Sequence, residues 1–333
     1  MRECALDSKI WAVPAGKKEK LLLTLRQIGG MAGAALAFAW LTVACGVKDV
    51  TVLPPEQVLP LLEASLEELL ARVQEQSEAI RSVNARAELL ASTGSAYSGV
   101  IEQYRDVRAY VLAQRGESGP ANSAAATHIR LLGQAPVVRK NVFDMVADET
   151  EFRIYIPPKN KFIVGQTRME RVSEKPIENL RPQHLLEAFL LLPPGRALHA
   201  LEENEVGGTR YYVVSEIAVE GERASVLRKW WFRRTNLALA RMQRFGPRGE
   251  LASDVHYDVW TQHGHLRYPH WILFVRPQED YRLEFRFDRV ELNPGLDPDR
   301  FRLEQPEGTE LVDLTRPADE KPAAGKPPAE PRP

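Results

Sequence analysis

The sequence predicts an α+β domain: a curved antiparallel sheet, or half-barrel, of about ten strands, with a lid of two or more helices over an apolar concavity. Segments in which apolar and polar residues alternate follow one another through most of the chain, separated by Gly, Pro and Asn. Only two segments have the residue spacing of an amphipathic helix. A sheet of that size tends to curl, and two helices are few to cover its apolar face. We therefore expect part of that face to remain open as a concavity.

The first 44 residues have the layout of a bacterial export signal. Lysine and arginine residues between positions 17 and 26 precede an apolar run without charge over 28–44. Ala44 stands directly before Cys45, and the segment 41–45 (LTVAC) resembles the lipobox of bacterial lipoproteins. That resemblance implies that Cys45 is lipidated and becomes the N-terminus of the mature chain. Residues 1–44 are then the signal peptide, and residues 45–55 are a tether.

Two other fates of the apolar run remain open. It is about 17 residues long, at the short end of what spans a bilayer as a helix, so it can act as an uncleaved signal anchor in the inner membrane. It can also belong to a signal that is cleaved to release a soluble domain. All three place the remainder of the chain outside the cytoplasm. Gly46, rather than aspartate, follows the cysteine, and by resemblance to enterobacterial sorting rules this favours the periplasm-facing side of the outer membrane.

The composition excludes a disulfide-stabilised domain and disfavours a polyanion-binding one. The chain has two cysteines, and Cys4 lies in the predicted signal peptide, so the mature domain has no pair to oxidise. Its stability has to come from a hydrophobic core, for which the remaining length is sufficient. The formal net charge is −1, which gives no general attraction for nucleic acid.

Both predicted helices have recognisable limits. Ser65 and Glu68 have the spacing of a capping box, and leucine and valine residues follow at helical intervals up to Ile80. The second helix covers 181–190, with a proline in its first turn, and stops before the Pro-Pro-Gly at 193–195. These are the two helices available to cover the sheet.

The strands are predicted from alternation with a period of two residues. The clearest segment is 281–287, in which Tyr, Leu and Phe alternate with charged residues. Its apolar phase slips at Val290, which indicates a bulge or the end of the strand. Residues 116–127 are predicted to form a flexible loop, and residues 315–333, rich in Pro, Ala, Lys and Glu, a disordered tail. Further strands are predicted at 152–156, 162–164, 211–219, 226–232, 237–245, 251–261 and 271–275.

Three segments, taken in order, resemble the LolA/LolB-like superfamily of periplasmic lipoprotein carriers and outer-membrane lipoprotein receptors. They are 66–85 for its opening helix, 148–157 for its aspartate-led aromatic hairpin, and 297–314 for its closing phrase. Glu149 stands where that hairpin usually has glycine. The resemblance covers residues 56–314 and implies a half-barrel that holds acyl chains in its cavity. The lipobox cysteine resembles the membrane-tethered receptor branch, since the shuttling carrier is soluble.

The candidate site residues follow from the predicted faces of the helices and strands. Cys45 is the candidate for lipid attachment. The candidates for the wall or lid of a hydrophobic ligand cavity are Leu66, Leu69, Val73, Phe152, Ile154, Phe162, Tyr281, Leu283 and Phe285. The same apolar stripes also suit an ordinary core, and they form a ligand wall only where the helices leave the concavity unfilled.

Signals for other chemistry are weaker. His263 and His265, near His256 and His270, have short metal-ligand spacing, but Gly264 places them in a turn, so we predict no metal site. The sequence has no Gly-x-Ser-x-Gly elbow, and its serines fall in predicted loops or caps. We therefore predict neither an enzyme nor a cofactor.

A basic and aromatic cluster at 228–234 (RKWWFRR) has two interpretations. In the first, Trp230 and Phe232 face the core and the cations are solvated strand residues. In the second, the cluster is a rim that meets anionic lipid head groups. Nucleic acid is not an expected partner outside the cytoplasm.

The sequence thus predicts an outer-membrane-associated lipoprotein, anchored through Cys45, that binds acyl chains or the lipid moieties of lipoproteins in a half-barrel cavity. We expect a monomer that takes part in lipoprotein or lipid transfer without catalysis. The alternative is a non-catalytic envelope assembly factor or lipid-sensing interaction protein, in which side chains fill the same cavity.

Overall fold

The computed structural model describes residues 60–94, 101–116, 127–137, 139–167 and 182–315. The chain divides into two compact units, Met1–Gln57 and Val58–Pro333, and every described residue belongs to the second. The predicted signal peptide, Cys45, the tether, and most of the predicted loop and tail therefore lie outside the described residues. The second unit contains the whole sheet and its core, as a domain that folds on its own does.

The strands that the structure describes form one sheet of fourteen. In chain order they are β1 (Ser82–Thr93), β2 (Glu102–Gln114), β3 (His128–Gln134), β4 (Asn141–Ala147), β5 (Glu151–Ile156), β6 (Lys161–Gln166), β7 (Leu198–Val206), β8 (Thr209–Glu220), β9 (Arg223–Arg233), β10 (Leu239–Phe245), β11 (Leu251–His263), β12 (Leu266–Arg276), β13 (Tyr281–Leu292) and β14 (Glu310–Asp313). Across the sheet the order is β14-β6-β5-β4-β3-β2-β1-β13-β12-β11-β10-β9-β8-β7. Neighbouring strands are antiparallel, except that β14 runs parallel to β6.

The structure is mostly sheet, open and curled, with few helices, but the expected count of about ten strands is wrong. Small inward-facing residues hide the alternation of the early strands: Ala85 and Ala87 on β1, and Ala109 and Ala113 on β2, are all buried. β7 is an edge strand with almost every residue exposed, and β14 has only four residues. These strands lack the alternation of large apolar residues that marks a strand in a sequence.

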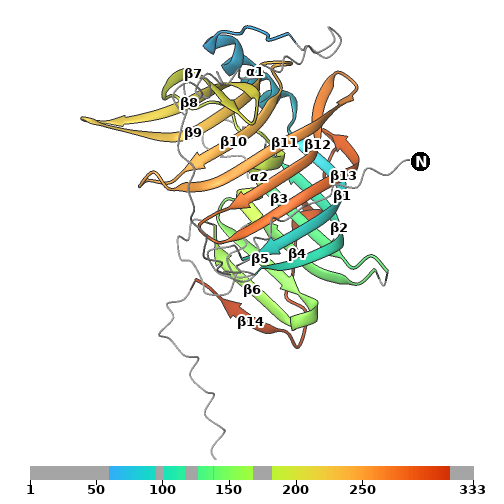
Figure 1. The fold of residues 1–333 in the computed structure, drawn as a ribbon. Coiled ribbons are helices and arrows are strands. Elements are labelled where there is room, and N and C mark those ends of the chain that lie inside the picture. Colours follow the sequence, from blue (N-terminus) through green and yellow to red (C-terminus); the bar gives the residue numbers. More distant parts are fainter. Residues whose placement is uncertain (1–59, 95–100, 117–126, 138, 168–181, 316–333) are drawn as a thin grey trace, which may run out of the picture. The chain divides into compact units, whose positions relative to one another are not determined.

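β1 joins the early and late strands into one sheet, as Figure 1 shows. It pairs with β2 on one side and with β13 on the other. The register with β13 shifts between the pair Arg86–Arg289 and the pair Ala87–Phe287, so that Asp288 is the extra residue of a bulge. Of the two explanations for the slipped phase at Val290, the bulge is therefore correct.

Two α-helices accompany the sheet among the described residues, α1 (Leu66–Ala79) and α2 (Pro182–Phe189). α1 starts as predicted: the Ser65 hydroxyl accepts from the backbone N–H of Glu68, and the Glu68 carboxylate accepts from the N–H of Ser65. It ends earlier than the segment 66–85 that resembles the superfamily's opening helix, because the chain is already extended at Ser82, where β1 begins.

The two faces of the sheet carry separate hydrophobic clusters. We call the face that packs against both helices the inner face, and its cluster includes Leu69 of α1 and Phe189 of α2. On the opposite, outer face, residues that follow β13 pack against the strands. The members of the two outer clusters are Leu112, Leu296, Phe301, Val146, Phe162 and Leu303.

Candidate functional site

The candidate site is the inner face of the sheet, and most of the predicted cavity or lid residues meet there. Leu66 of α1 packs half-buried against the inner-face cluster. The members of that cluster from the predicted set, all buried, are Leu69, Val73, Phe152, Ile154, Tyr281, Leu283 and Phe285. One apolar face is thus assembled from α1, β5 and β13, which are far apart in the sequence.

Phe162 is the exception, because it lies on the outer face. The connection between β5 and β6 makes Ile156 oppose Lys161, so that Ile163, and not Phe162, opposes Ile154. Phe162 instead packs with Val146 and Leu303 and lines an outer depression of about 540 Å³. The prediction that Phe162 belongs to the same wall as Phe152 and Ile154 is therefore wrong.

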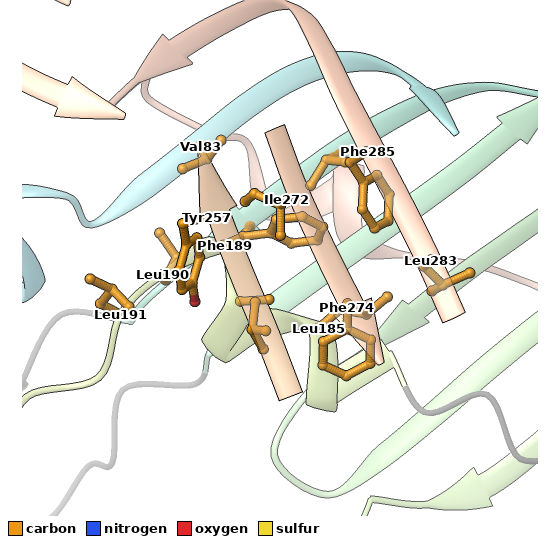
Figure 2. Packing of buried hydrophobic residues seen from close by; sticks show 14 of the residues in the cluster. Val83, Leu185, Phe189, Leu190, Leu191, Tyr257, Ile272, Phe274, Leu283 and Phe285 are labelled. Carbon is orange, nitrogen blue, oxygen red and sulfur yellow. The ribbon is translucent and has the colours of Figure 1, made fainter. Parts of the chain in front are cut away.

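The short helix α2 packs against the aromatic part of the inner face. The ring of Phe189 lies edge to face with that of Phe285, at a centroid distance of 5.1 Å, and 6.1 Å from that of Phe287. The Tyr268 hydroxyl of β12 donates to the Phe189 carbonyl over 3.1 Å. Figure 2 shows Leu185 and Phe189 among the inner-face residues of the neighbouring strands. The centre of the inner face is thus covered by helix side chains.

Sequence reasoning predicted this helix but did not assign its residues to the site. Leu185 and Phe189 stand four residues apart, the spacing that places two side chains on one face of a helix. Ile272 and Phe274 of β12 are also buried in the inner-face cluster, two residues apart as on one face of a strand. Both spacings can be read from the sequence. The sequence does not show that the two pairs of side chains pack into the same cluster.

Little empty space remains beside α2. The space bordered by Phe189, Tyr257 and Tyr268 measures only about 10 Å³. A larger pocket of about 200 Å³ lies between α1, the turn from β9 to β10, and the β11–β12 hairpin. Ligand pockets are commonly about 300–1,000 Å³, so neither space accommodates a long acyl chain as it stands. The predicted open concavity is filled here by the side chains of α2.

We call the 200 Å³ pocket the mouth pocket. Its apolar lining includes Val73, Leu191, Phe232, Leu239, Trp260 and Leu266, and its charged lining consists of two cations and one carboxylate, Arg72, Arg267 and Glu75. Gln76, Leu191 and Trp260 also line the small space beside Phe189, so the two spaces are adjacent. The mouth pocket is therefore separated from the space beside Phe189 only by these shared side chains.

In the basic and aromatic cluster at 228–234, Trp230 and Phe232 face the core, as the first of the two interpretations expects. Trp230 and Phe232 are buried in the inner-face cluster, while Trp231 faces outward and donates from Nε1 to Gln243 over 2.9 Å. The cations are paired rather than simply solvated. The ion pairs are Arg228–Glu216, Lys229–Glu202, Arg233–Asp258 and Arg234–Glu203.

A row of polar residues crosses the inner face at one end. Directly opposed residues on β7 to β11 form it, and we call it the polar row: His199, Glu216, Arg228, Arg244 and Ser253. The Arg228 Nε lies 3.2 Å from Glu216 Oε2, and these side chains are only 13% and 3% exposed. The backbone N–H of Gly195 donates to Glu216 Oε1 over 2.7 Å. Arg244 pairs with Glu187 of α2, so the polar row also contacts the helix.

Two other carboxylates, one on β11 and one in the connection between β4 and β5, are held in their charged form. Burial raises the pKa of Asp254, but hydrogen bonds from Arg241 and His256 outweigh it, so the net pKa is lowered. Asp148, the aspartate of the segment that resembles the superfamily's hairpin, accepts from the backbone N–H groups of Thr150 and Glu151 over 2.7 and 2.9 Å. Burial raises its pKa too, yet the hydrogen bonds to Thr150 and Glu151 leave it lowered.

These lowered pKa values predict loss of stability in acid. A carboxyl group whose pKa is lower in the folded chain stabilises the fold above its unfolded value, which is 3.8 for aspartate. That contribution disappears as the pH falls through the folded pKa. We expect the urea concentration at the unfolding midpoint to decrease as the pH is lowered below about 4. In the Asp254→Asn variant this decrease should be smaller. An equal pH dependence in the variant and the parent would contradict this role of Asp254.

The histidines of the β11–β12 hairpin form a pair. The Nε2 atoms of His263 and His270 lie 3.0 Å apart, with the rings stacked. His265 lines the mouth pocket instead. Within the described residues, no group of three or more His, Cys, Asp or Glu side chains is arranged to hold a metal ion.

Comparison with known proteins finds similarity at the level of structure. No protein-family model and no curated protein sequence matches the chain. A DUF1329 family protein from Desulfovibrio piger shares 13% identity at a TM-score of 0.49, over 70% of this chain and 94% of that one. An outer membrane lipoprotein-sorting protein domain from Vibrio parahaemolyticus shares 11% sequence identity at a TM-score of 0.46, over 70% of this chain and 94% of that one. A LolA superfamily protein from Nitrosomonas europaea shares 11% sequence identity at a TM-score of 0.43, over 72% of this chain and 99% of that one.

One of these solved structures is of a protein of the LolA superfamily. The helices that the structure describes include none long and apolar enough to cross a membrane.

Proposed function

We propose that the domain binds an acyl chain against the inner face of the sheet, in the place that α2 occupies. One observation carries this proposal: the centre of a wide apolar face is covered by a helix of only eight residues. In the proposed function, Cys45 anchors the domain to the periplasmic side of the outer membrane. There the domain receives acyl chains or the lipid moieties of lipoproteins and takes part in their transfer.

The way α2 is held supports an exchange with lipid. A helix of eight residues is too short to be stable by itself, so contacts with the sheet keep it in place. Most of these contacts are apolar, through buried Leu185, Ala188 and Phe189. An acyl chain offers the sheet the same apolar surface, and each methylene that it buries contributes about 0.8 kcal/mol. Lipid and helix therefore compete for one surface on similar terms.

The mouth pocket supplies a way in. Its apolar lining suits the end of an acyl chain, and it adjoins the space beside Phe189. Arg72 and Arg267 lie at the same pocket, and cations with apolar stems suit contact with a lipid surface. A chain that starts in this pocket can advance along the inner face as α2 withdraws.

Displacement of a fluorescent fatty acid tests the proposal. Residues 58–333 should bind the probe saturably, and unlabelled palmitate should displace it while acetate, which has no chain to bury, should not. A cooperatively folded domain that shows no saturable binding would rule out the carrier function. Thermal unfolding of the same sample shows whether the protein is folded, so that absence of binding is not confused with misfolding.

The anchor has its own test. Cys45→Ala is expected to leave an uncleaved precursor in the inner membrane, because the resemblance to lipoproteins makes this cysteine the site of lipid attachment. Gel mobility and membrane fractionation of the full chain measure this. Normal processing of the variant would contradict lipidation at Cys45, and would leave the binding proposal unaffected.

The filled interior supports a second candidate function. Only about 10 Å³ is empty beside Phe189, as expected of an envelope assembly or lipid-sensing interaction protein whose cavity is occupied by side chains. That function predicts no displacement by palmitate and no change in α2 when lipid is added. The fatty-acid assay therefore discriminates between the two candidates.

A further inference from the structure

Several buried polar atoms of the polar row and of other residues on the inner face have no hydrogen-bond partner among the described residues. Three of them are donors: Arg228 Nη1, Trp230 Nε1 and the Tyr257 hydroxyl. Trp230 and Tyr257 are 0% and 2% exposed. His199 Nε2 and the carboxylate oxygens Glu187 Oε2 and Glu216 Oε2 are also without a hydrogen-bond partner, although Glu216 Oε2 lies 3.2 Å from Arg228 Nε in the ion pair. Buried polar groups in native proteins are nearly always hydrogen-bonded, so a concentration of unpartnered ones needs a physical explanation.

Two of the unpartnered donors, on Arg228 and Trp230, belong to side chains that lie against each other. The Arg228 guanidinium lies over the Trp230 ring, 4.9 Å from its centroid, and the His199 ring lies 6.4 Å from the same ring. Tyr257 lies on the same inner face, two residues along β11 from Val255, and Val255 opposes Met242, the residue paired with Trp230. Burial raises the pKa of Tyr257 well above its usual value, so its hydroxyl keeps the proton that it can donate. Tyr257 also borders the small space beside Phe189.

We infer that the polar row, with Trp230 and Tyr257, binds the anionic head group of a single-chain lipid whose acyl chain lies on the inner face. The inference rests on the proposed function and specifies its ligand: an amphiphile that carries a carboxylate or a phosphate. Arginine, indole and phenol groups all donate to oxygen anions, and such charge-assisted hydrogen bonds are the strong ones. The adjoining apolar residues Met242 and Val255 continue the same face toward β12.

Glu187 is the internal competitor in this arrangement. Its carboxylate reaches from α2 to Arg244, whose side chain is 47% exposed and so gives the polar row access to solvent. An incoming head group replaces the Glu187 carboxylate at Arg244 and supplies acceptors for the unpartnered donors. Removing the charge of Glu187 therefore favours anionic ligands and has little effect on neutral ones.

Three ligands of equal chain length separate head-group binding from acyl binding. Palmitate, hexadecyl phosphate and hexadecanol are each used to displace the fluorescent fatty acid from residues 58–333. We expect at least one of the two anions to bind about tenfold more tightly than the alcohol, the size of effect that a charge-assisted hydrogen bond gives. The comparison of carboxylate with phosphate identifies the head group.

Conservative variants then assign the donors. Tyr257→Phe removes only the hydroxyl, and should weaken the preferred anion about tenfold while leaving hexadecanol unchanged. Trp230→Phe should also weaken binding of the preferred anion. Glu187→Gln should strengthen it. Tyr211→Phe and Glu205→Gln are the matched controls, since Tyr211 packs edge-on against outward-facing Trp231 and Glu205 pairs with Arg210 at the surface.

The outcomes are distinct. Equal affinity for all three ligands, or an equal loss of all three in Tyr257→Phe, would overturn the head-group site while acyl binding stands. Absence of binding by every ligand would overturn the proposed function itself. Thermal unfolding of each variant checks that it is folded, and Tyr257→Phe should be no less stable than the parent, because the deleted hydroxyl has no partner.

Discussion

Replacing Phe189 with alanine is expected to strengthen acyl binding while it weakens the fold. The ring packs edge to face on Phe285 in the inner-face cluster, and deleting such a buried ring costs about 3–5 kcal/mol. The loss falls on the docking of α2, so the state in which the inner face is free becomes more populated. A ligand that binds this state gains apparent affinity, by at least about tenfold.

The matched control is Phe285→Ala on β13. It removes the partner ring and costs a similar amount of stability, but it also removes part of the surface that the acyl chain contacts. We expect this variant to bind no more tightly than the parent. Fluorescent fatty-acid displacement measures both affinities, and hydrogen exchange of residues 182–189 measures the docking of α2. If Phe285→Ala binds the fatty acid more tightly than the parent, or if Phe189→Ala does not, α2 and lipid do not compete.

The second large effect is expected at the buried ion pair of the polar row. Arg228→Met leaves Glu216, whose side chain is 3% exposed, without its cation. Removing one partner of a buried pair costs about 3–5 kcal/mol, because the remaining charge is uncompensated. The double variant Arg228→Met/Glu216→Gln should recover much of that loss, since it removes the stranded charge as well. Urea unfolding gives the free energies for the comparison.

A surface pair provides the reference for this experiment. Arg210 and Glu205 are 53% and 56% exposed, and Arg210→Met should change the free energy of unfolding by no more than about 1 kcal/mol. If the single variants at positions 228 and 210 cost the same, the row would not be the low-dielectric site that we describe. A double variant no more stable than Arg228→Met would lead to the same conclusion.

Local signals in the sequence predicted local structure well. The capping box at Ser65 begins α1, and the alternation over 281–287 lies within β13. The slipped phase at Val290 corresponds to a bulge at Asp288. Each of these features depends on residues within a few positions of one another, where side-chain spacing fixes the backbone pattern.

Features that depend on register and packing were not predictable in the same way. Phe162 was assigned to the wrong face because the connection between β5 and β6 decides which residue opposes Ile154. The polar row comes from five strands, and nothing in their sequences states that they align. Whether the helices fill the concavity depends on volume, which a sequence pattern does not contain.

The N-terminal segment and the inner face fit one physical account. Lipidation at Cys45 would bring the domain to a bilayer, where acyl chains are the abundant apolar ligand. The inner face presents apolar surface to such a chain, and the polar row provides donors for its head group. If residues 41–45 act as a lipobox, the lipid anchor would also place the domain beside its proposed ligand.

Photo-crosslinking tests directly whether an acyl chain binds at the inner face. A palmitate analogue with a photoreactive group near the end of its chain is bound to residues 58–333 and irradiated, and the modified peptides are identified by mass spectrometry. We predict modification within Leu266–Arg276 and Tyr281–Leu292, the strands whose inner-face residues surround Phe189. Excess palmitate should prevent it. Modification confined to outer-face residues such as Phe162 and Leu303, or labelling that palmitate does not reduce, would contradict acyl binding at the inner face.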